Sequence, residues 1–285
     1  MMGFLNIDKP AGLGSRDVTS RLAYRLRPHK VGHVGTLDPL ATGVLVLCVG
    51  KATRLSDLLH SLPKVYEARF AWNRRSDTED SEGHVEAVNH PPVDADAVRE
   101  ILPRFTGQIE QTPPAFSAKR IRGKRAYDLA RAGRTVDLPP KTVTVQSLEL
   151  LDCDESHFAL RIECGSGTYV RSLGRDIAAA CGGSVVMDRL RRTRVGPFDV
   201  ADAISMEEVD ASPEEHLVDA AAAVSHLSSV DVLEEEVRPV LDGRKIVRDG
   251  APPGTVAMLD GGSLLALGEC DGRTIKPRTV LRDRG

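Results

Sequence analysis

The sequence lacks a cysteine framework. Its five cysteines, an odd number, are scattered along the chain and never spaced as a C-x-x-C pair, so neither a disulfide scaffold nor a zinc site is indicated. His29 and His33 lie close together, yet no third ligand of metal-binding type stands near them. We therefore expect no bound metal.

Long apolar runs are missing as well. No stretch approaches the roughly 20 apolar residues that a membrane span needs, and residues 1–10 lack the basic and then apolar layout of a secretion signal. We expect a cytoplasmic protein without a membrane partner. The chain has 285 residues, of which 41% are apolar, so it can build a sizeable core, and its length favours one large domain with a small appendage.

The chain also lacks the net positive charge that is usual in nucleic-acid-binding domains, because its formal charge is -3. The basic residues are nevertheless clustered. Lysines and arginines crowd residues 119–134, where Asp128 is the single acid, and arginines crowd residues 189–194, while acids collect at residues 77–86 and 234–236. Either run alone could be a solvated helix face. Two acid-poor runs together favour RNA, since each neutralised phosphate releases condensed counterions.

Apolar periodicity predicts a mixed α and β fold. Helices are expected near residues 15–26, 55–62, 94–105, 126–132 and 169–180. Strands are expected at residues 44–49, 65–72 and 158–163. The first of these strands is a continuous, valine-rich run and should be buried on both faces, whereas the other two alternate as half-buried strands do.

The C-terminal part is predicted to be a small, strand-rich module. A helix should start at Ser212-Pro213-Glu214-Glu215, and a polar stretch follows at residues 225–231. Beyond it we expect a short helix at residues 234–241 and strands, separated by Asp-Gly turns, at residues 256–259, 264–268 and 275–281. We place the domain boundary after residue 228, which gives domains 1–228 and 229–285.

Residues 32–45, GHVGTLDPLATGVL, carry the strongest chemical signal. Glycines flank His33 and permit sharp turns or close approach of a ligand, while Asp38 stands just before the predicted buried strand and is followed by Pro39, which fixes the chain direction. A carboxylate in such a loop can act as a nucleophile, and it can equally cap a surface turn. A phosphate-binding P-loop is rejected because Ala52 stands where a serine or threonine must hold magnesium.

This segment resembles the G-H-x-G-x-L-D-P-x-A-x-G-x-L signature of the TruB-type tRNA pseudouridine synthases. Further segments agree in the family's order: DKPAG at 8–12, KVY at 64–66, PPAFSA at 113–118, GKRAY at 123–127, GTYVRSL at 167–173 and LRRT at 190–193. Together they cover about the first 195 residues. The C-terminal module is similar in pattern to the family's PUA-like RNA-binding appendage.

The resemblance implies an α+β pseudouridine synthase fold, with a central mixed, largely antiparallel sheet flanked by helices and a small β-rich PUA-like C-terminal domain. It implies isomerisation of uridine to pseudouridine at position 55 in the T arm of tRNA, by base flipping and an aspartate-dependent break and re-formation of the glycosidic bond. The reaction is redox neutral, so no cofactor is expected. Whether Asp38 attacks the sugar, attacks the base or promotes elimination is left open.

The resemblance also assigns catalytic roles. Asp38 is the implied catalytic carboxylate, and Arg171 should hold it in one rotamer through a two-pronged contact that lysine could not copy. Tyr66 should lie over the uracil. Each of these residues alone could be structural, but their co-occurrence favours an active site.

Substrate-binding residues follow in the same way. His33 should take part in displacing the target base, whose flipping costs a few kcal/mol, while Tyr169 should pack beneath the site and Leu190 should form an apolar wall. The other residues implied to contact substrate are Lys9, Gly35, Thr36, Lys119, Arg122 and Lys124.

Two other classes compete with a self-sufficient enzyme. One is an RNA-binding or RNA-folding protein that has the scaffold without the activity, and the joint presence of Asp38, Tyr66 and Arg171 speaks against it. The other is a synthase that needs a guide RNA and partner proteins. The absence of long basic tails and the presence of both basic patches favour a monomer that acts on tRNA without guide RNA or protein partner. Residues 72–78 depart from the family pattern, so the shape of that loop is not predicted.

Overall fold

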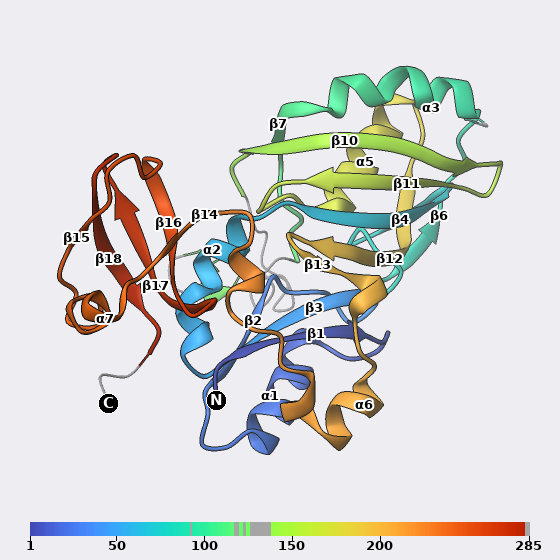
Figure 1. Ribbon diagram of the computed structural model, residues 1–285. Coiled ribbons are helices and arrows are strands. Elements are labelled where there is room, and N and C mark those ends of the chain that lie inside the picture. The colour runs from blue at the N-terminus through green and yellow to red at the C-terminus, as the bar shows by residue number, and fades with distance from the viewer. Residues whose placement is uncertain (92, 117–119, 122–123, 126–137, 283–285) are drawn as a thin grey trace. The chain divides into compact units, whose positions relative to one another are not determined.

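A computed structural model describes residues 1–91, 93–116, 120–121, 124–125 and 138–282 (Figure 1). The chain divides into two compact units. Unit 1 comprises Met1–Pro39, Gly43–His60 and Arg194–Gly285, and unit 2 comprises Leu40–Thr42 and Ser61–Thr193. None of the described helices combines the length and the apolar composition that crossing a membrane requires.

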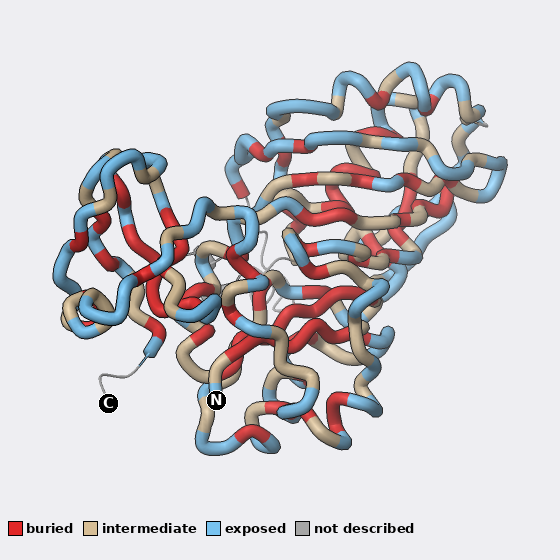
Figure 2. Tube along the Cα trace, viewed as in Figure 1, coloured by how far each residue is buried: buried red, intermediate tan, exposed pale blue. Residues whose placement is uncertain are grey.

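The N-terminal strands of unit 1 pair around β3 (Thr42–Val49). Strand β1 (Gly3–Lys9) is antiparallel to β3 along its whole length, and β2 (Val31–Val34) is antiparallel to the second half of β3. Both β1 and β3 are buried almost throughout (Figure 2). The run at residues 44–49 is therefore the buried strand that its valines predicted.

Helix α1 (Ser15–Arg25) follows β1 and confirms the predicted helix. It begins at Gly14, whose backbone N–H donates to the Asp17 carboxylate at 3.0 Å, and it buries Val18 and Leu22 completely. After β3, the 3-10 helix η1 (Gly50–Leu55) leads into α2 (Ser56–Ser61), which is the second expected helix.

Unit 2 contains an antiparallel sheet whose strands come from distant parts of the chain. Its strands lie in the order β4 (Lys64–Trp72), β11 (His157–Cys164), β10 (Lys141–Cys153) and β7 (Gly107–Gln111). Strand β12 (Val185–Val195) is the other neighbour of β4 in this sheet. Further described elements of this part of the chain are α3 (Ala95–Ile101), η2 (Leu102–Phe105), β8 (Arg120–Ile121), β9 (Lys124–Arg125) and α5 (Val170–Ala180). The strands and helices expected at 65–72, 94–105, 158–163 and 169–180 are confirmed.

Helix α5 approaches the sheet closely at Gly174. A Cβ at this position would lie 2.0 Å from the ring of Phe70, so only glycine allows the present distance between helix and sheet. Phe70 itself stacks on Phe158 with ring centroids 4.9 Å apart. The position of α5 over the sheet is thus set by core packing.

Residues 72–78, whose shape was not predicted, form the start of a small hairpin. Asn73 has a positive φ of 58°, which asparagine tolerates better than most residues. It turns the chain from β4 into β5 (Arg74–Ser76), which pairs with β6 (Val85–Ala87). The loop between them, residues 77–84, carries all of the acids noted at 77–86 except Glu86, which lies in β6.

The C-terminal module of unit 1 has its own sheet and core. Its strands lie in the order β14 (Ser228–Asp231), β16 (Gly254–Asp260), β17 (Ser263–Cys270), β18 (Thr274–Val280) and β15 (Ile246–Val247). Helix α7 (Glu234–Leu241) contributes Val240 to a core with Met258 and Leu265. The pairs are antiparallel except for β14 with β16. The α+β fold with a mainly antiparallel sheet and a strand-rich C-terminal part is confirmed.

One local expectation was wrong. Ser212-Pro213-Glu214-Glu215 starts only a short 3-10 turn, η4 (Pro213–His216), because Ser212 serves as the C-cap of α6 (Met206–Ala211) and the side-chain cap is made upstream by Ser205. Within the polar stretch at 225–231, residues 228–231 form β14, whose backbone pairs with β16. Short elements β13 (Phe198–Asp199), η3 (Val200–Asp202) and η5 (Ala222–Val224) complete this part of the chain. The helix expected at 126–132 lies outside the described residues.

Candidate active site

Asp38 lies in the loop between β2 and β3, and both of its neighbours are anchored. The backbone N–H of Leu37 donates to the hydroxyl of Ser15 at 2.7 Å, and the same hydroxyl donates to the Leu37 carbonyl at 3.0 Å. On the other side, the Pro39 carbonyl accepts from the backbone N–H of Gly12 at 2.8 Å. Asp38 is half-buried, so the loop presents its carboxylate from a fixed backbone.

Lys9 supports this loop from within unit 1. Its side chain is fully buried, and its ammonium donates to the carbonyls of Pro10 at 2.8 Å, Leu13 at 2.7 Å and Pro39 at 3.4 Å. Three carbonyl acceptors match the three donors of an ammonium group. The geometry therefore gives Lys9 the role of tying the chain after β1 to the Asp38 loop, and a direct contact with substrate stays a prediction.

His33 is held by a hydroxyl on each side of its ring. Its Nδ1 lies 3.0 Å from Thr19 Oγ1 and its Nε2 lies 3.3 Å from Thr36 Oγ1. Because the Thr19 hydroxyl already donates to the Ser15 carbonyl at 2.7 Å, the neutral imidazole donates through Nδ1 and accepts through Nε2. Gly35, with a φ of +70°, makes the turn between His33 and Thr36 possible.

Arg171 stands in the first turn of α5 and makes directed contacts within unit 2. Its guanidinium donates to the Thr78 carbonyl at 2.8 Å and to the Phe116 carbonyl at 3.1 Å, and it forms an ion pair with Asp80 at 3.1 Å. The two charged side chains are 8% and 4% exposed. Asp80 also offsets the unfavourable position of a cation at a helix N-terminus.

Asp80, the buried partner of Arg171, is not among the residues that the sequence predicts for the site, because an acidic stretch by itself indicates a solvated surface. Besides Arg171, its carboxylate accepts from the Glu82 backbone N–H at 3.1 Å and from the Thr78 hydroxyl at 2.5 Å. The sequence offers only two consecutive acids, Glu79 and Asp80, and a distant predicted helix with two arginines four positions apart. No local pattern connects the two segments.

Tyr66, Tyr169 and Leu190 all belong to unit 2. Tyr66 is half-buried in β4, opposite Ile162 of β11. Tyr169 is the N-cap of α5, where its N–H donates to the Gln111 side chain at 2.8 Å and its carbonyl accepts from that side chain at 3.0 Å. Leu190, in β12, is 8% exposed.

The short segment Leu40–Thr42, just after the Asp38 loop, belongs to unit 2. The hydroxyl of Thr42, four positions beyond Asp38 in the chain, lies 3.4 Å from the Leu190 carbonyl and 3.5 Å from Arg191 Nη1. Unit 1 thus brings together Lys9, His33, Gly35, Thr36 and Asp38, and unit 2 holds Tyr66, Tyr169, Arg171 and Leu190. The contact expected between Asp38 and Arg171 stays a prediction. Lys119 and Arg122 lie outside the described residues, and of Lys124 the structure describes the backbone.

Two of the buried cysteines are poorly suited to act as nucleophiles. All five are free thiols, and burial raises the pKa of Cys48 to about 12 and the pKa of Cys164 to about 11. Both are therefore protonated at neutral pH. Within the described ranges, no group of three or more His, Cys, Asp and Glu side chains is arranged to hold a metal ion.

Comparison with known families identifies the chain as a pseudouridylate synthase. Residues 23–170 match the family model described as the TruB family pseudouridylate synthase N-terminal domain, and residues 171–240 match that of the tRNA pseudouridylate synthase B C-terminal domain. The chain belongs to the TruB family. It is therefore an enzyme, an isomerase that forms pseudouridine, and the membership expected from the signature is confirmed.

Similar proteins extend over nearly the whole chain. The protein named tRNA pseudouridine synthase B from Azoarcus sp. (strain BH72) is 37% identical, over 98% of this chain and 94% of its own length. Its namesake from Aquifex aeolicus (strain VF5) is 38% identical, over 99% of this chain and all of its own length. Among solved structures, a chain of an H/ACA RNP bound to a substrate RNA containing 2'-deoxyuridine has a TM-score of 0.76 at 25% identity, covering 99% of this chain and 86% of that chain.

Proposed function

We propose that this enzyme converts uridine 55 in the T arm of tRNA to pseudouridine, as a monomer and without a guide RNA. The observation that carries the proposal is the Asp38 loop, whose neighbours on both sides are fixed by buried polar contacts. Relatives named tRNA pseudouridine synthase B, which match from end to end, support tRNA as the substrate. Their identity of 37–38% exceeds the 25% to a chain from an H/ACA RNP, which favours guide-independent activity.

The proposed chemistry needs only side chains. The bond between uracil N1 and the sugar C1' breaks, and a bond from C5 to C1' forms. C5 loses its hydrogen as a proton and N1 gains a proton, so atoms and electrons balance. Asp38, as a carboxylate, acts as nucleophile or as counter-charge to the sugar, and Arg171 orients it.

Because the base is stacked inside the arm, it must be flipped out first. His33 takes part in that displacement, Tyr66 covers the uracil, Tyr169 packs below it and Leu190 forms an apolar wall.

Position and self-sufficiency are tested with an unmodified tRNA transcript and the purified protein alone. Carbodiimide labelling followed by primer extension is expected to show pseudouridine at position 55 and no stop there when that uridine is replaced by cytidine. A T-arm stem-loop is expected to be modified as well. Pseudouridine at another position, or formation that depends on an added guide RNA, would contradict the proposal.

We further propose that residues 229–285 bind tRNA away from the target base. A cleft in unit 1 is lined by four cations, Lys51, Arg54, Arg278 and Arg282, with Asp242 as the acid in its lining. The backbone carbonyl of Val280 accepts from Arg54 at 2.5 Å, so η1 and β18 meet there. Such a concentration of cations suits the phosphodiester backbone.

The double replacement Lys51→Ala with Arg278→Ala is expected to weaken tRNA binding and to lower the slope of log affinity against log salt by about 2, because two phosphate contacts are lost. The single-turnover rate at saturating enzyme should not change. Arg273→Ala, which removes an exposed cation of the same module that pairs with Asp249, serves as the control and should have a smaller effect. An unaltered salt dependence in the double variant would rule out the cleft as an RNA contact.

A further inference from the structure

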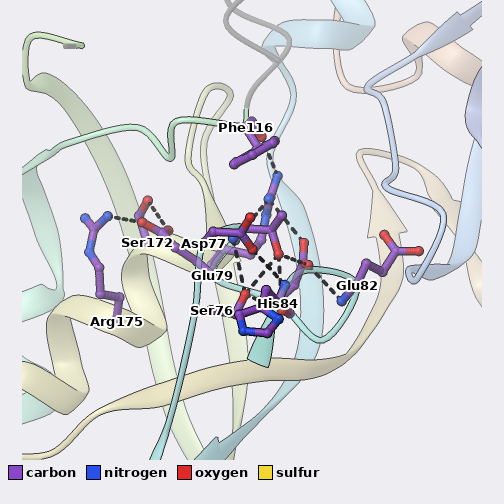
Figure 3. A network of polar contacts seen from close by, with 11 residues as sticks. Ser76, Asp77, Glu79, Glu82, His84, Phe116, Ser172 and Arg175 are labelled. Carbon is purple, nitrogen blue, oxygen red and sulfur yellow. Dashed lines mark hydrogen bonds and ion pairs between the residues drawn. The ribbon is translucent and has the colours of Figure 1, made fainter. Parts of the chain in front are cut away.

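Two arginines of α5 face two consecutive acids of the loop at residues 77–84. Arg171 and Arg175 are four positions apart and therefore project from the same face of the helix. Asp80 pairs with Arg171 at 3.1 Å, and Glu79 pairs with Arg175 (Figure 3). The loop thus meets the helix at two points separated by one helical turn.

Glu79 is more constrained than an ordinary surface glutamate. One carboxylate oxygen accepts from the Ser172 hydroxyl at 3.0 Å, and the other pairs with Arg175, which also donates to the Thr112 carbonyl at 3.2 Å. Its φ of +63° lies in the left-handed region that non-glycine residues rarely adopt. Burial raises the pKa of this carboxyl, against the opposing influence of Arg175 and Ser172. A residue persists in such a state when its surroundings over-determine it.

The backbone of the same residues is joined to β12. The Met187 N–H donates to the Glu79 carbonyl at 3.1 Å, and the Ser81 N–H donates to the Met187 carbonyl at 3.0 Å. This places Asp80 in a parallel bridge opposite Met187. The loop therefore connects the helix that carries Arg171 with the strand that carries Leu190.

The backbone contacts with β12 hold the loop but do not by themselves determine how its side chains meet the helix. The second ion pair, one turn along α5 from the first, fixes which acid meets which arginine. Since Arg171 also donates to the Thr78 carbonyl of this loop, any shift of the loop shifts the guanidinium. We propose that Glu79, through Arg175 and Ser172, is a positioning residue that sets the register of the loop on α5 and thereby holds Arg171 in its working orientation.

The effect should appear in the rate more than in the stability. The side chains of Arg175 and Glu79 are 35% and 16% exposed, and a partly solvated ion pair adds little to the free energy of unfolding. Positioning is far more sensitive, because a small misplacement of a catalytic group lowers the rate steeply. This inference rests on the proposed function only where catalysis is the readout.

The test uses Glu79→Gly and Glu79→Asn, which both suit a positive φ and so remove the carboxylate without straining the backbone. Arg175→Met removes the partner. Asp176→Asn is the matched control, because Asp176 accepts from Arg175 Nε at 2.8 Å and is not part of the loop. The first three variants are expected to lower the single-turnover rate at saturating enzyme by about tenfold or more, with tRNA affinity within about twofold and an unchanged melting temperature. The control should resemble the parent.

Two further measurements decide the case. In a protein that already carries Arg171→Lys, the change Glu79→Gly should add little, because both act through one group. Hydrogen exchange of residues 77–84, which needs no RNA, should quicken in Glu79→Gly and Arg175→Met but not in Asp176→Asn. Additive rate losses, or unchanged exchange in this loop, would overturn the inference. A parent enzyme that leaves tRNA unmodified would refute the proposed function instead. The hydrogen-exchange result would still show whether Glu79 fixes the position of the loop at residues 77–84 on α5.

Discussion

Replacing Asp38 with asparagine is expected to abolish pseudouridine formation, with a loss of about 10⁴-fold or more in the single-turnover rate. The amide keeps the size of the side chain and removes the negative charge that either proposed role requires. The loop should keep its shape, because Ser15 holds Leu37 and Lys9 holds Pro39 independently of the carboxylate. The variant should therefore still bind tRNA and melt at the temperature of the parent.

Asp57→Asn is the control, since Asp57 is an acid of α2 in the same unit and lies outside the Asp38 loop. It should leave the rate unchanged. The rate is measured with enzyme in excess over labelled tRNA, so that binding does not limit it. Turnover by homogeneous Asp38→Asn above the level of contaminating parent enzyme would remove Asp38 from the catalytic role.

Arg171→Lys is expected to lower the single-turnover rate by about 10²-fold while tRNA affinity changes little. Arginine reaches two carbonyls and a carboxylate in different directions with one planar group. Lysine offers a single point charge, which can satisfy Asp80 but cannot fix an orientation at the same time. Retaining the charge avoids leaving Asp80 buried without a counter-ion, so the protein should remain folded.

The matched control is Arg161→Lys, because Arg161 is a half-exposed arginine of β11 that pairs loosely with Glu67 at 3.8 Å. Rates and binding constants for both variants separate orientation from affinity. A parent-like rate in Arg171→Lys would show that the fork geometry has no catalytic importance.

The local sequence pattern was sufficient to predict those helices and strands whose buried residues recur with the period of a helix or a strand. Val18 and Leu22 predicted α1, and the valines of residues 44–49 predicted β3, because apolar burial leaves a periodic trace in sequence. Strand β14 left none. It is a polar segment, mostly exposed, and it is a strand because β16 provides backbone partners.

The sequence signature located the predicted site residues, but it did not reveal the residues that contact them and hold them in place. Asp38 could be identified because its loop is contiguous, whereas Glu79 and Asp80 bind partners about 90 positions away in the chain. Taken by itself, an acidic stretch predicts a solvated surface. Burial of its acids depends on arginines supplied by another element, which no local pattern records. The buried position of Lys9 could not be predicted either, because its carbonyl partners are brought together only by the fold.

The close approach of Gly174 to Phe70 has a mechanical consequence for α5. Gly174 lies between Arg171 and Arg175 in the chain, so the point where the helix backbone comes nearest the sheet is also the segment that the acidic loop grips. The ring of Phe70 prevents inward movement, and the two ion pairs resist sliding and rotation. The same segment of the helix is thus held by the sheet on one side and by the acidic loop on another. Arg171 therefore owes its place to two neighbouring contacts, one of the helix with the sheet and one of the helix with the loop at residues 77–84.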